Sequence, residues 1–249
     1  MLNRQGDILP PLYYDLYPGH NLEDLPFWLD LAYRQSSPLL ELGCGTGRVF
    51  LPLILAGYQA IGLDHDRRML DYLLQANHLD LNRWLICADM TTFHLGLAFN
   101  LIIIPCNTYA TFPENTRRQT LRQVFQHLRP AGLLAISLPN PVVLRSLPKH
   151  NPPELEEIVA HPIDGNPVQI SSAWERSTNQ LTIFWYYDHL FTDGRIERFG
   201  FHQAYYLASV DNYLDELRWA GFTHLTIFGN FHHSSYSENS PDLIILASV

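Results

Sequence analysis

The chain has 249 residues, 47% of them hydrophobic and only 16% charged, which is enough apolar material for the core of one elaborated domain. Its formal net charge is −9, and its 16 Lys and Arg are scattered among 25 acids. A nucleic-acid partner requires a clustered basic surface and is therefore disfavoured. The densest basic stretch is interpreted as the outer face of a helix and contains Arg117, Arg118, Arg122 and Arg129.

The three cysteines, Cys44, Cys87 and Cys106, are an odd number with no close pair. They fit neither a disulfide framework nor the ligand spacing of a structural zinc site. The N-terminus lacks the layout of a signal peptide, and no apolar run reaches about 18 residues. We therefore expect a cytoplasmic protein with no membrane association.

From about Pro38 onward, short apolar runs alternate with longer segments of helical period. This pattern is typical of a parallel sheet wound with helices. The strand expected at 99–104 is continuously apolar, as in a strand covered on both faces. The predicted strands of this half are 39–42, 59–63, 84–88, 99–104 and 133–138, and the predicted helices are 46–56, 67–77 and 115–128.

The pattern changes in the second half of the chain. Residues 139–167 are rich in proline and predict a connector with little regular structure. Turn signals at Thr178-Asn179 and Asp193-Gly194 then separate three predicted antiparallel strands. We expect these strands at 168–174, 180–190 and 196–207.

The final segment returns to a helix-and-strand pattern. Ser209 is expected to cap a helix that runs through Trp219 and ends at Gly221. Two last strands are predicted at 222–228 and 243–249. The chain therefore reads as a single α/β domain, residues 1–249, whose core sheet carries an antiparallel insertion.

A glycine-rich turn, Glu41-Leu42-Gly43-Cys44-Gly45-Thr46-Gly47, stands between the first predicted strand and helix. Glycines allow the backbone to approach a ligand closely, and the N-terminus of the following helix suits an anionic group. Tight packing alone could also explain such a turn. However, Asp64 ends the next strand, where a carboxylate can accept both hydroxyls of a ribose. We therefore predict a cofactor that contains adenosine.

Charge distinguishes between the candidate cofactors. A dinucleotide fingerprint requires its third glycine where this chain has Arg48. Glu41 would be unfavourable beside a diphosphate but suits an ammonium or a sulfonium. Asp89, at the end of the third strand, can accept from an adenine amino group. These three acids favour S-adenosylmethionine over a nicotinamide dinucleotide; an oxidoreductase and a non-catalytic cofactor-binding module remain the alternatives.

With these motifs, residues 38–140 and the segment from Ser209 onward resemble the class I S-adenosylmethionine-dependent methyltransferases. Residues 39–47 are similar to the first motif of that family, Gly62-Leu63-Asp64 to its ribose-binding strand end, and Ala88-Asp89-Met90 to its adenine-binding segment. The resemblance implies a set of cofactor-binding residues: Glu41, Gly43, Cys44, Gly45, Gly47, Arg48, Asp64, His65, Asp89, Met90 and Cys106.

The antiparallel insertion and the ending 240–246 resemble the subgroup that contains sugar-amine N-methyltransferases. This resemblance implies a Rossmann-like α/β fold with a seven-stranded mixed sheet of order 3-2-1-4-5-7-6, its last strand antiparallel, and a β insertion after the fifth strand. The implied parts are an N-terminal lid (1–37), a cofactor-binding core (38–140), a connector with a substrate flap (141–207), and a C-terminal helix with a β-hairpin (208–249).

Two local segments bear on the substrate. Tyr14-Asp15-Leu16-Tyr17 resembles the N-terminal aromatic lid of members that act on small molecules. Enzymes that methylate nucleic-acid bases or glutamine carry an Asn/Asp-Pro-Pro-aromatic motif, where this chain has Pro105-Cys106-Asn107-Thr108-Tyr109. We therefore expect a small-molecule methyl acceptor, methylated on N or O. An exposed edge of the flap could also pair two subunits into a homodimer.

Methyl transfer from a sulfonium is an in-line displacement, so the protein must mainly align the reactants and exclude water. His202 is the first candidate for a general base and His189 the second, although each could be an ordinary strand residue. The resemblance adds Asn107, beside the transferred methyl. Tyr13 and Tyr14 could contact the sulfonium or pack on the core. The predicted catalytic set is His202, Asn107 and Tyr14.

Two further polar groups have alternative interpretations. Arg48 could pair with the cofactor carboxylate or lie on the surface of a helix. The pair His232-His233 could bind a metal, but no carboxylate lies at ligand spacing in the local sequence, so no metal site is expected.

Overall fold

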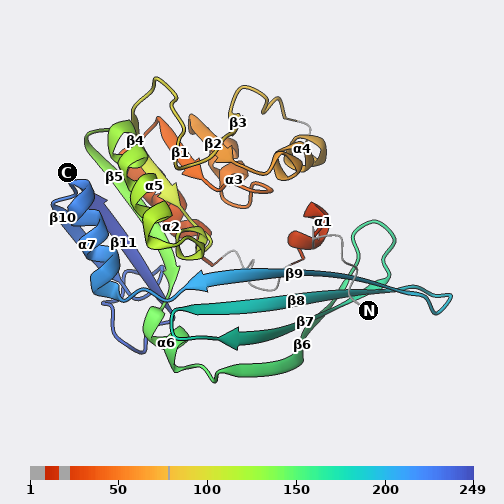
Figure 1. The fold of residues 1–249 in the computed structure, drawn as a ribbon. Coiled ribbons are helices and arrows are strands. Elements are labelled where there is room, and N and C mark those ends of the chain that lie inside the picture. The colour runs from red at the N-terminus through yellow and green to blue at the C-terminus, as the bar shows by residue number, and fades with distance from the viewer. Residues whose placement is uncertain (1–8, 17–22, 78) are drawn as a thin grey trace. The chain divides into compact units, whose positions relative to one another are not determined.

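The structure is a computed structural model that describes residues 9–16, 23–77 and 79–249 (Figure 1). The chain divides into two compact units. The flap unit comprises Met1–Asn21 and Ser146–Leu207, and the core unit comprises Leu22–Arg145 and Ala208–Val249. Tyr17, part of the expected aromatic lid, lies outside the described residues.

The core unit is built on a seven-stranded sheet in the order β10-β11-β5-β4-β1-β2-β3. β11 pairs antiparallel with both β5 and β10, and the other neighbours pair in parallel. This arrangement confirms the expected strand order and the antiparallel last strand. The strands are β1 (Leu39–Leu42), β2 (Ala60–Asp64), β3 (Leu85–Cys87), β4 (Phe99–Ile104), β5 (Leu128–Pro139), β10 (His224–Phe228) and β11 (Asp242–Ser248).

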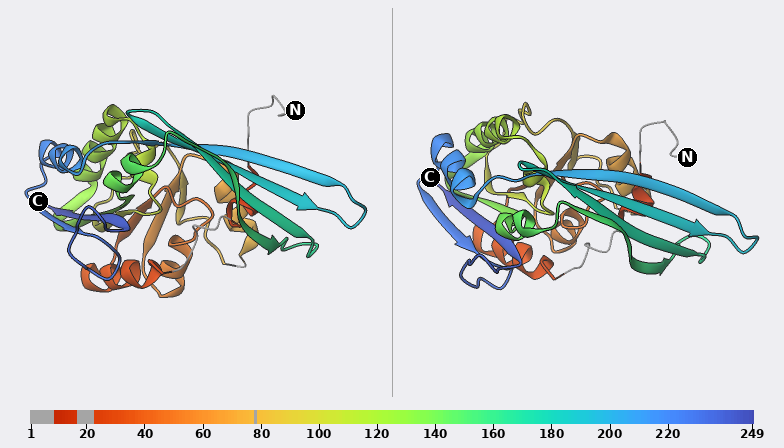
Figure 2. Two further views of the ribbon diagram at one scale, coloured as in Figure 1. Left: turned by 90° about the horizontal axis from the view of Figure 1, so that it is seen from below. Right: turned by 60° about the horizontal axis from the view of Figure 1, so that its bottom comes forward.

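Helices cover both faces of this sheet, with α2 and α3 on one side and α5 and α7 on the other (Figure 2). Ser209 caps α7 with a reciprocal capping box and Gly221 ends the helix in a left-handed conformation, as expected. The helices are α2 (Leu25–Gln35), α3 (Phe50–Leu55), α4 (Arg67–Ala76), the short 3₁₀ helix η1 (Thr108–Thr111), α5 (Glu114–His127), α6 (Pro141–Ser146) and α7 (Val210–Ala220).

Helix α2 belongs to the core unit because its apolar side chains are part of the hydrophobic core of that unit. The sequence had placed the residues of this helix in an N-terminal lid. Phe27 and Trp28 of α2 are buried and pack with Phe50 of α3 and with Leu39 and Leu101 of the sheet. Burial of these large side chains contributes about 1.5–3 kcal/mol each to stability. The lid at 1–37 remains a prediction for the residues that precede this helix.

Helix α5 lies on the other face of the sheet and contains most of the basic stretch that was expected to form an outer helix face. For Arg117, the first residue of this stretch, that expectation was wrong. Arg117 is buried between α5 and α7, where its guanidinium pairs with the buried carboxylate of Glu216. Arg122 is exposed on α5, as expected. Arg129 is also exposed, but it lies in β5 and not on a helix, because α5 ends at His127. The sequence hides this difference because Glu216 lies about a hundred residues farther along the chain.

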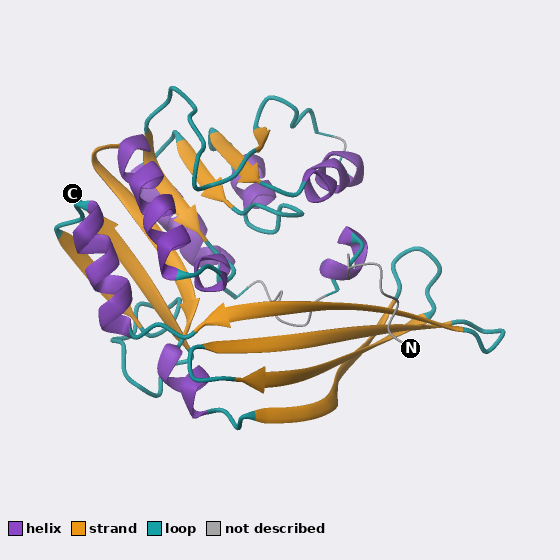
Figure 3. Cartoon of the chain, viewed as in Figure 1, coloured by secondary structure: helices purple, strands orange, loops and turns teal. Residues whose placement is uncertain are grey.

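The flap unit is a four-stranded antiparallel sheet in the order β6-β7-β8-β9 (Figure 3). Its strands are β6 (His150–Ala160), β7 (Pro167–Arg176), β8 (Gln180–Leu190) and β9 (Ile196–Tyr206). The expectation of an irregular connector at 139–167 was therefore wrong, since this range contains α6 and β6. Pro152 and Pro153 fit the strand because β6 is at the sheet edge and its register shifts between Asn151 and Glu154.

The short N-terminal helix α1 (Pro11–Tyr14) packs on the flap sheet within the same unit. Tyr13 is buried in a cluster with Val168, Ile170 and Tyr187, which favours the packing alternative for this residue. Tyr14 is less buried, and its ring lies 6.4 Å from that of Phe201. Among the described residues, no helix is both long enough and apolar enough to cross a membrane.

Candidate functional site

The glycine-rich turn follows β1, which lies between β2 and β4 in the middle of the core sheet. From β1 the chain order runs outward through β2 and β3 on one side and through β4 and β5 on the other. This reversal is the topological switch point at which open α/β sheets bind ligands, beyond the carboxyl ends of their strands. The fold therefore places the turn where a cofactor is expected.

The two possible reasons for glycine in this turn apply to different residues. Gly47 (φ +93°) is required for packing, since a Cβ there would lie 2.6 Å from Leu73 of α4. Gly45 (φ +52°) also needs the left-handed conformation, but no protein atom lies within 4 Å of the position of its Cβ. The backbone at Gly45 is therefore open to a ligand. The helix predicted from residue 46 starts only at Phe50, because residues 43–49 form this turn.

Asp64, at the end of β2, is buried and braces the turn. One carboxylate oxygen accepts the Gly45 N–H at 2.8 Å, and the other accepts the Asp66 N–H at 2.8 Å. Each carboxylate oxygen has two lone pairs, so further acceptor capacity remains on both atoms. This arrangement can accept the two hydroxyls of a ribose without giving up the contact with the turn.

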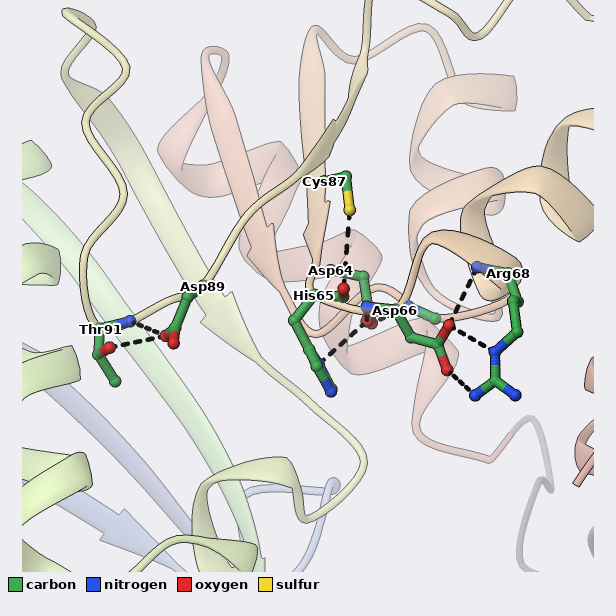
Figure 4. A network of polar contacts seen from close by, with 8 residues as sticks. Asp64, His65, Asp66, Arg68, Cys87, Asp89 and Thr91 are labelled. Atoms are coloured by element: carbon green, nitrogen blue, oxygen red, sulfur yellow. Dashed lines mark hydrogen bonds and ion pairs between the residues drawn. The ribbon is translucent and has the colours of Figure 1, made fainter. Parts of the chain in front are cut away.

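His65 and Asp89 extend the polar edge of the sheet beyond β2 and β3 (Figure 4). The exposed His65 ring lies 3.4 Å from Asp64, and the hydrogen bond between them raises the pKa of His65. Asp89 is also exposed, and hydrogen bonds from the Thr91 hydroxyl and N–H lower the pKa of its carboxyl. Asp89 is therefore an ionised acceptor on the surface, as an adenine amino group would require.

Met90 and Cys44 complete this part of the expected set as buried neighbours. The Met90 Cε lies 3.7 Å from the position that a Cβ on Gly43 would occupy. The Cys44 Sγ would lie 2.9 Å from a Cβ on Gly62, so its thiol packs closely on β2. Burial raises the pKa of the Cys44 thiol well above its ordinary value, which keeps it protonated and makes it a packing residue.

Glu41 is the most unusual carboxyl of the site. It is 2% exposed, and its Oε2 atom is buried without a hydrogen-bond partner. Burial raises the pKa of Glu41 well above its ordinary value; the Arg48 charge opposes this shift, and Asp64 and Asp24 add to it. A buried unpaired acceptor is costly. A cationic ligand near Glu41 would both satisfy the oxygen and favour the ionised carboxylate.

Arg48 lies in the turn before α3, and its side chain is only 14% exposed, so the surface-helix alternative was wrong. Its guanidinium donates to both oxygens of Asp24, at 2.6 and 2.7 Å, and to the Cys106 Sγ at 2.9 Å. Trp28 donates to the same Asp24 carboxylate at 2.8 Å. A role for Arg48 toward a cofactor carboxylate remains a prediction. Asp24 is not among the residues predicted from the sequence, because no local motif marks this pairing.

Cys106 and Asn107 follow β4 with left-handed backbone, at φ +58° and +61°. Such angles cost a non-glycine residue of order 1 kcal/mol or more and cluster at ligand-binding sites. Burial raises the pKa of the Cys106 thiol to about 11, although the Arg48 charge lowers it. The thiol therefore stays protonated and is not a nucleophile. Its contact with the cofactor remains a prediction.

The remaining predicted residues belong to the flap unit. His202 is exposed on β9, in register with Phe184 of β8. His189 is buried, and its two ring nitrogens contact Tyr13 and Asp164, so it is already engaged. His232 and His233 are in the core unit, exposed, and the His233 ring lies against Phe27 and Phe228. The catalytic roles of His202, Tyr14 and Asn107 remain predictions.

The donor set of the core unit fits S-adenosylmethionine. Gly45 leaves backbone open to a ligand, Asp64 keeps acceptor capacity for a ribose, and the unpaired Glu41 oxygen suits a cation. A diphosphate would instead place its negative charge beside the Glu41 carboxyl, which is unfavourable. The geometry therefore favours the cationic cofactor over the dinucleotide.

Comparisons with known proteins also indicate a methyltransferase. Residues 39–132 match the family described as "Methyltransferase domain". A putative methyltransferase of Geobacillus sp. (strain WCH70) is 25% identical over 218 residues, which cover 84% of this chain and 83% of that protein.

Two solved structures share the fold over nearly the whole chain. One is an S-adenosylmethionine-dependent methyltransferase from Clostridium acetobutylicum ATCC 824, with a TM-score of 0.79, 13% identity, and coverage of 95% of this chain and 96% of that one. The other is a sugar N-methyltransferase from Streptoalloteichus sp ATCC 53650, with a TM-score of 0.77, 18% identity, and coverage of 100% and 98%. Residues 39–132 thus match a methyltransferase domain, and the sheet order, the glycine turn and the three acids give the chain the fold of S-adenosylmethionine-dependent methyltransferases.

Proposed function

We propose that the enzyme transfers a methyl group to N or O of a small-molecule acceptor, and that the amine of an amino sugar is the first acceptor to test. The observation that carries this proposal is the flap unit: its four-stranded sheet lies within the part of the chain that matches the sugar N-methyltransferase fold. The net charge of −9 also disfavours a polyanionic substrate.

Within this proposal, the core unit holds the cofactor. Gly43, Gly45 and Gly47 shape its bed, Asp64 accepts the ribose hydroxyls, and Asp89 accepts from adenine. Glu41 faces the cationic end of the molecule. S-adenosylmethionine supplies a methyl group activated by a sulfonium. The protein has only to align the acceptor with it and exclude water.

The catalytic roles in this proposal are those predicted for three residues. His202 takes the proton that the acceptor N–H or O–H loses, Tyr14 contacts the acceptor, and Asn107 orients it. A general base of this kind contributes about 10²–10⁴-fold to the rate. Pairing of two subunits through the edge strand β6, where Leu155 and Ile158 are exposed, and a cytoplasmic location belong to the same proposal.

The test measures transfer of labelled methyl from S-adenosylmethionine to a panel of amino sugars, other small amines and hydroxyl compounds. We expect turnover of an amino sugar, and His202→Gln is expected to lower kcat by at least about 100-fold without weakening S-adenosylhomocysteine binding. The matched control is His150→Gln, because His150 is also an exposed histidine of the flap sheet. Cofactor binding without turnover of any N or O acceptor would contradict the proposed acceptor class, and equal kcat values for the two variants would remove the role of His202.

A glycine substitution tests whether the backbone at Gly45 contacts the cofactor. Gly45→Ala is expected to weaken S-adenosylhomocysteine binding by at least about tenfold in calorimetric titration, because a Cβ would enter space that is open to the ligand. Gly96→Ala is the control: Gly96 has φ +62° and no neighbour within 4 Å of its Cβ position, so backbone strain is matched. Equal losses of affinity in both variants would mean that strain, and not cofactor contact, explains the effect.

A further inference from the structure

Three side chains of the flap unit converge at one end of its sheet: His161 and Asp164 in the turn between β6 and β7, and His189 in β8. The turn is closed by hydrogen bonds from the His161 N–H to Asn166 and from the Gly165 N–H to His161. His189 pairs in register with Val168, next to the start of β7. The sheet register therefore carries His189 to this turn across more than twenty residues of sequence.

The three groups have the spacing of metal ligands. The Nδ1 atom of His161 lies 2.9 Å from an oxygen of Asp164, and the Nε2 atom of His189 lies 3.2 Å from the same carboxylate. All three candidate ligand atoms lie within 4.8 Å of one another. In a tetrahedral zinc site with bonds of about 2.0–2.2 Å, ligand atoms are roughly 3.3–3.5 Å apart, so small side-chain shifts would suffice.

The surroundings also suit a bound cation. His161 and His189 are only 8% and 3% exposed, whereas the Asp164 side chain is 34% exposed and gives access from solvent. The Phe191 ring lies 4.2 Å from the His189 ring in a tilted arrangement, and the Phe199 ring lies 4.4 Å from that of Tyr13, which itself lies beside both histidines. Such a shell limits competing water.

Tyr13 forms a hydrogen bond with one of the candidate ligands. Its hydroxyl lies 2.9 Å from the Nδ1 atom of His189, the ring nitrogen that does not face Asp164. Metal-binding histidines almost always use their second nitrogen in this way, which fixes the tautomer and the ring orientation.

We propose that His161, Asp164 and His189 form a binding site for a divalent first-row metal ion of the zinc class. His161 binds through Nδ1 and carries its proton on Nε2, whereas His189 binds through Nε2 and donates its Nδ1–H to Tyr13. The carboxylate supplies the third ligand, and water supplies the fourth. This set of two nitrogens and one oxygen matches the ligand preference of zinc and its neighbours.

The ion would connect three parts of the flap unit. It joins the β6–β7 turn to β8 and, through His189 and Tyr13, it stabilises the position of α1. Among the residues that the structure describes, these three form the one group with such spacing, and the His232-His233 pair considered from the sequence is not part of it. This inference concerns the flap unit alone and does not depend on the methyl acceptor.

The experiment uses the full chain, stripped of metal with a chelator and titrated with Zn²⁺ by calorimetry. We expect one zinc ion per chain, a rise in Tm on addition of zinc, and loss of affinity by at least about 100-fold in His161→Gln. His150→Gln is the control and keeps the wild-type affinity, because this exposed histidine of β6 lies outside the cluster. Co²⁺ substitution should give the visible absorption of a tetrahedral site in wild type and not in His161→Gln.

Two further variants test the carboxylate ligand and the hydrogen bond from His189 to Tyr13. Asp164→Asn removes the anionic ligand from the most exposed position and is expected to lose zinc affinity as His161→Gln does, whereas Tyr13→Phe is expected to lose about tenfold. Far-UV circular dichroism and a cooperative thermal transition show whether each variant is folded. The proposal is overturned if folded wild-type protein binds no zinc, or if wild type and both ligand variants bind it equally well.

Discussion

Replacement of Asp64 by asparagine is expected to weaken S-adenosylhomocysteine binding by at least about 100-fold. The carboxylate is buried, holds the Gly45 N–H at 2.8 Å, and keeps lone pairs for two ribose hydroxyls. Asparagine keeps one acceptor oxygen without the charge and replaces the other oxygen by a donor. A hydrogen bond to a charged group contributes about 1.5–3 kcal/mol and a neutral one about 0.5–1.5 kcal/mol, so loss of one bond and weakening of the other correspond to about 3 kcal/mol, or two orders of magnitude in Kd. Calorimetric titration of the purified variant measures this loss directly.

The control for this substitution is Asp71→Asn, which makes the same change of charge on α4. Asp71 is a partly exposed residue that pairs with Arg67 of the same helix. We expect its affinity for S-adenosylhomocysteine to equal that of the wild type. If Asp64→Asn also retained wild-type affinity while folded, the assignment of Asp64 to the ribose would be wrong.

The second large effect concerns stability and not the cofactor. Arg117 and Glu216 are 3% and 2% exposed, and two hydrogen bonds of 2.6 and 2.9 Å join the guanidinium to the carboxylate. The Tyr109 hydroxyl also donates to this carboxylate, at 3.2 Å. Arg117→Ala would leave a buried carboxylate without its cation. We expect it to lower the free energy of unfolding by about 3–5 kcal/mol.

Thermal unfolding monitored by circular dichroism would show this as a Tm lower by roughly 10 °C. Arg67→Ala is the control, because the pair it breaks with Asp71 is exposed on α4 and contributes little. The double replacement Arg117→Leu with Glu216→Leu should lose less stability than Arg117→Ala, since it leaves no unpaired charge. A single variant as stable as the wild type would show that the pair does not fasten α5 to α7.

Much of the core unit could be predicted from local sequence. The strands at 39–42 and 99–104 and the flap strand at 180–190 have the predicted bounds, because continuous apolar or alternating runs flanked by turn residues specify a strand locally. The capped helix after Ser209 follows from a similar short-range signal. The glycine turn and the acids Asp64 and Asp89 lie at strand ends, so their convergence follows once a parallel sheet is predicted.

The tertiary structure alone decided the features that depend on distant residues. The partners Asp24 and Arg48, and likewise Arg117 and Glu216, are separated by too much sequence for any period or motif to join them. The strand β6 was missed because proline disfavours a strand in general but is tolerated at an edge, and only the assembled sheet shows which strand is at the edge. His161, Asp164 and His189 likewise meet only through the register of the flap sheet, since strand pairing and not sequence distance sets which side chains become neighbours.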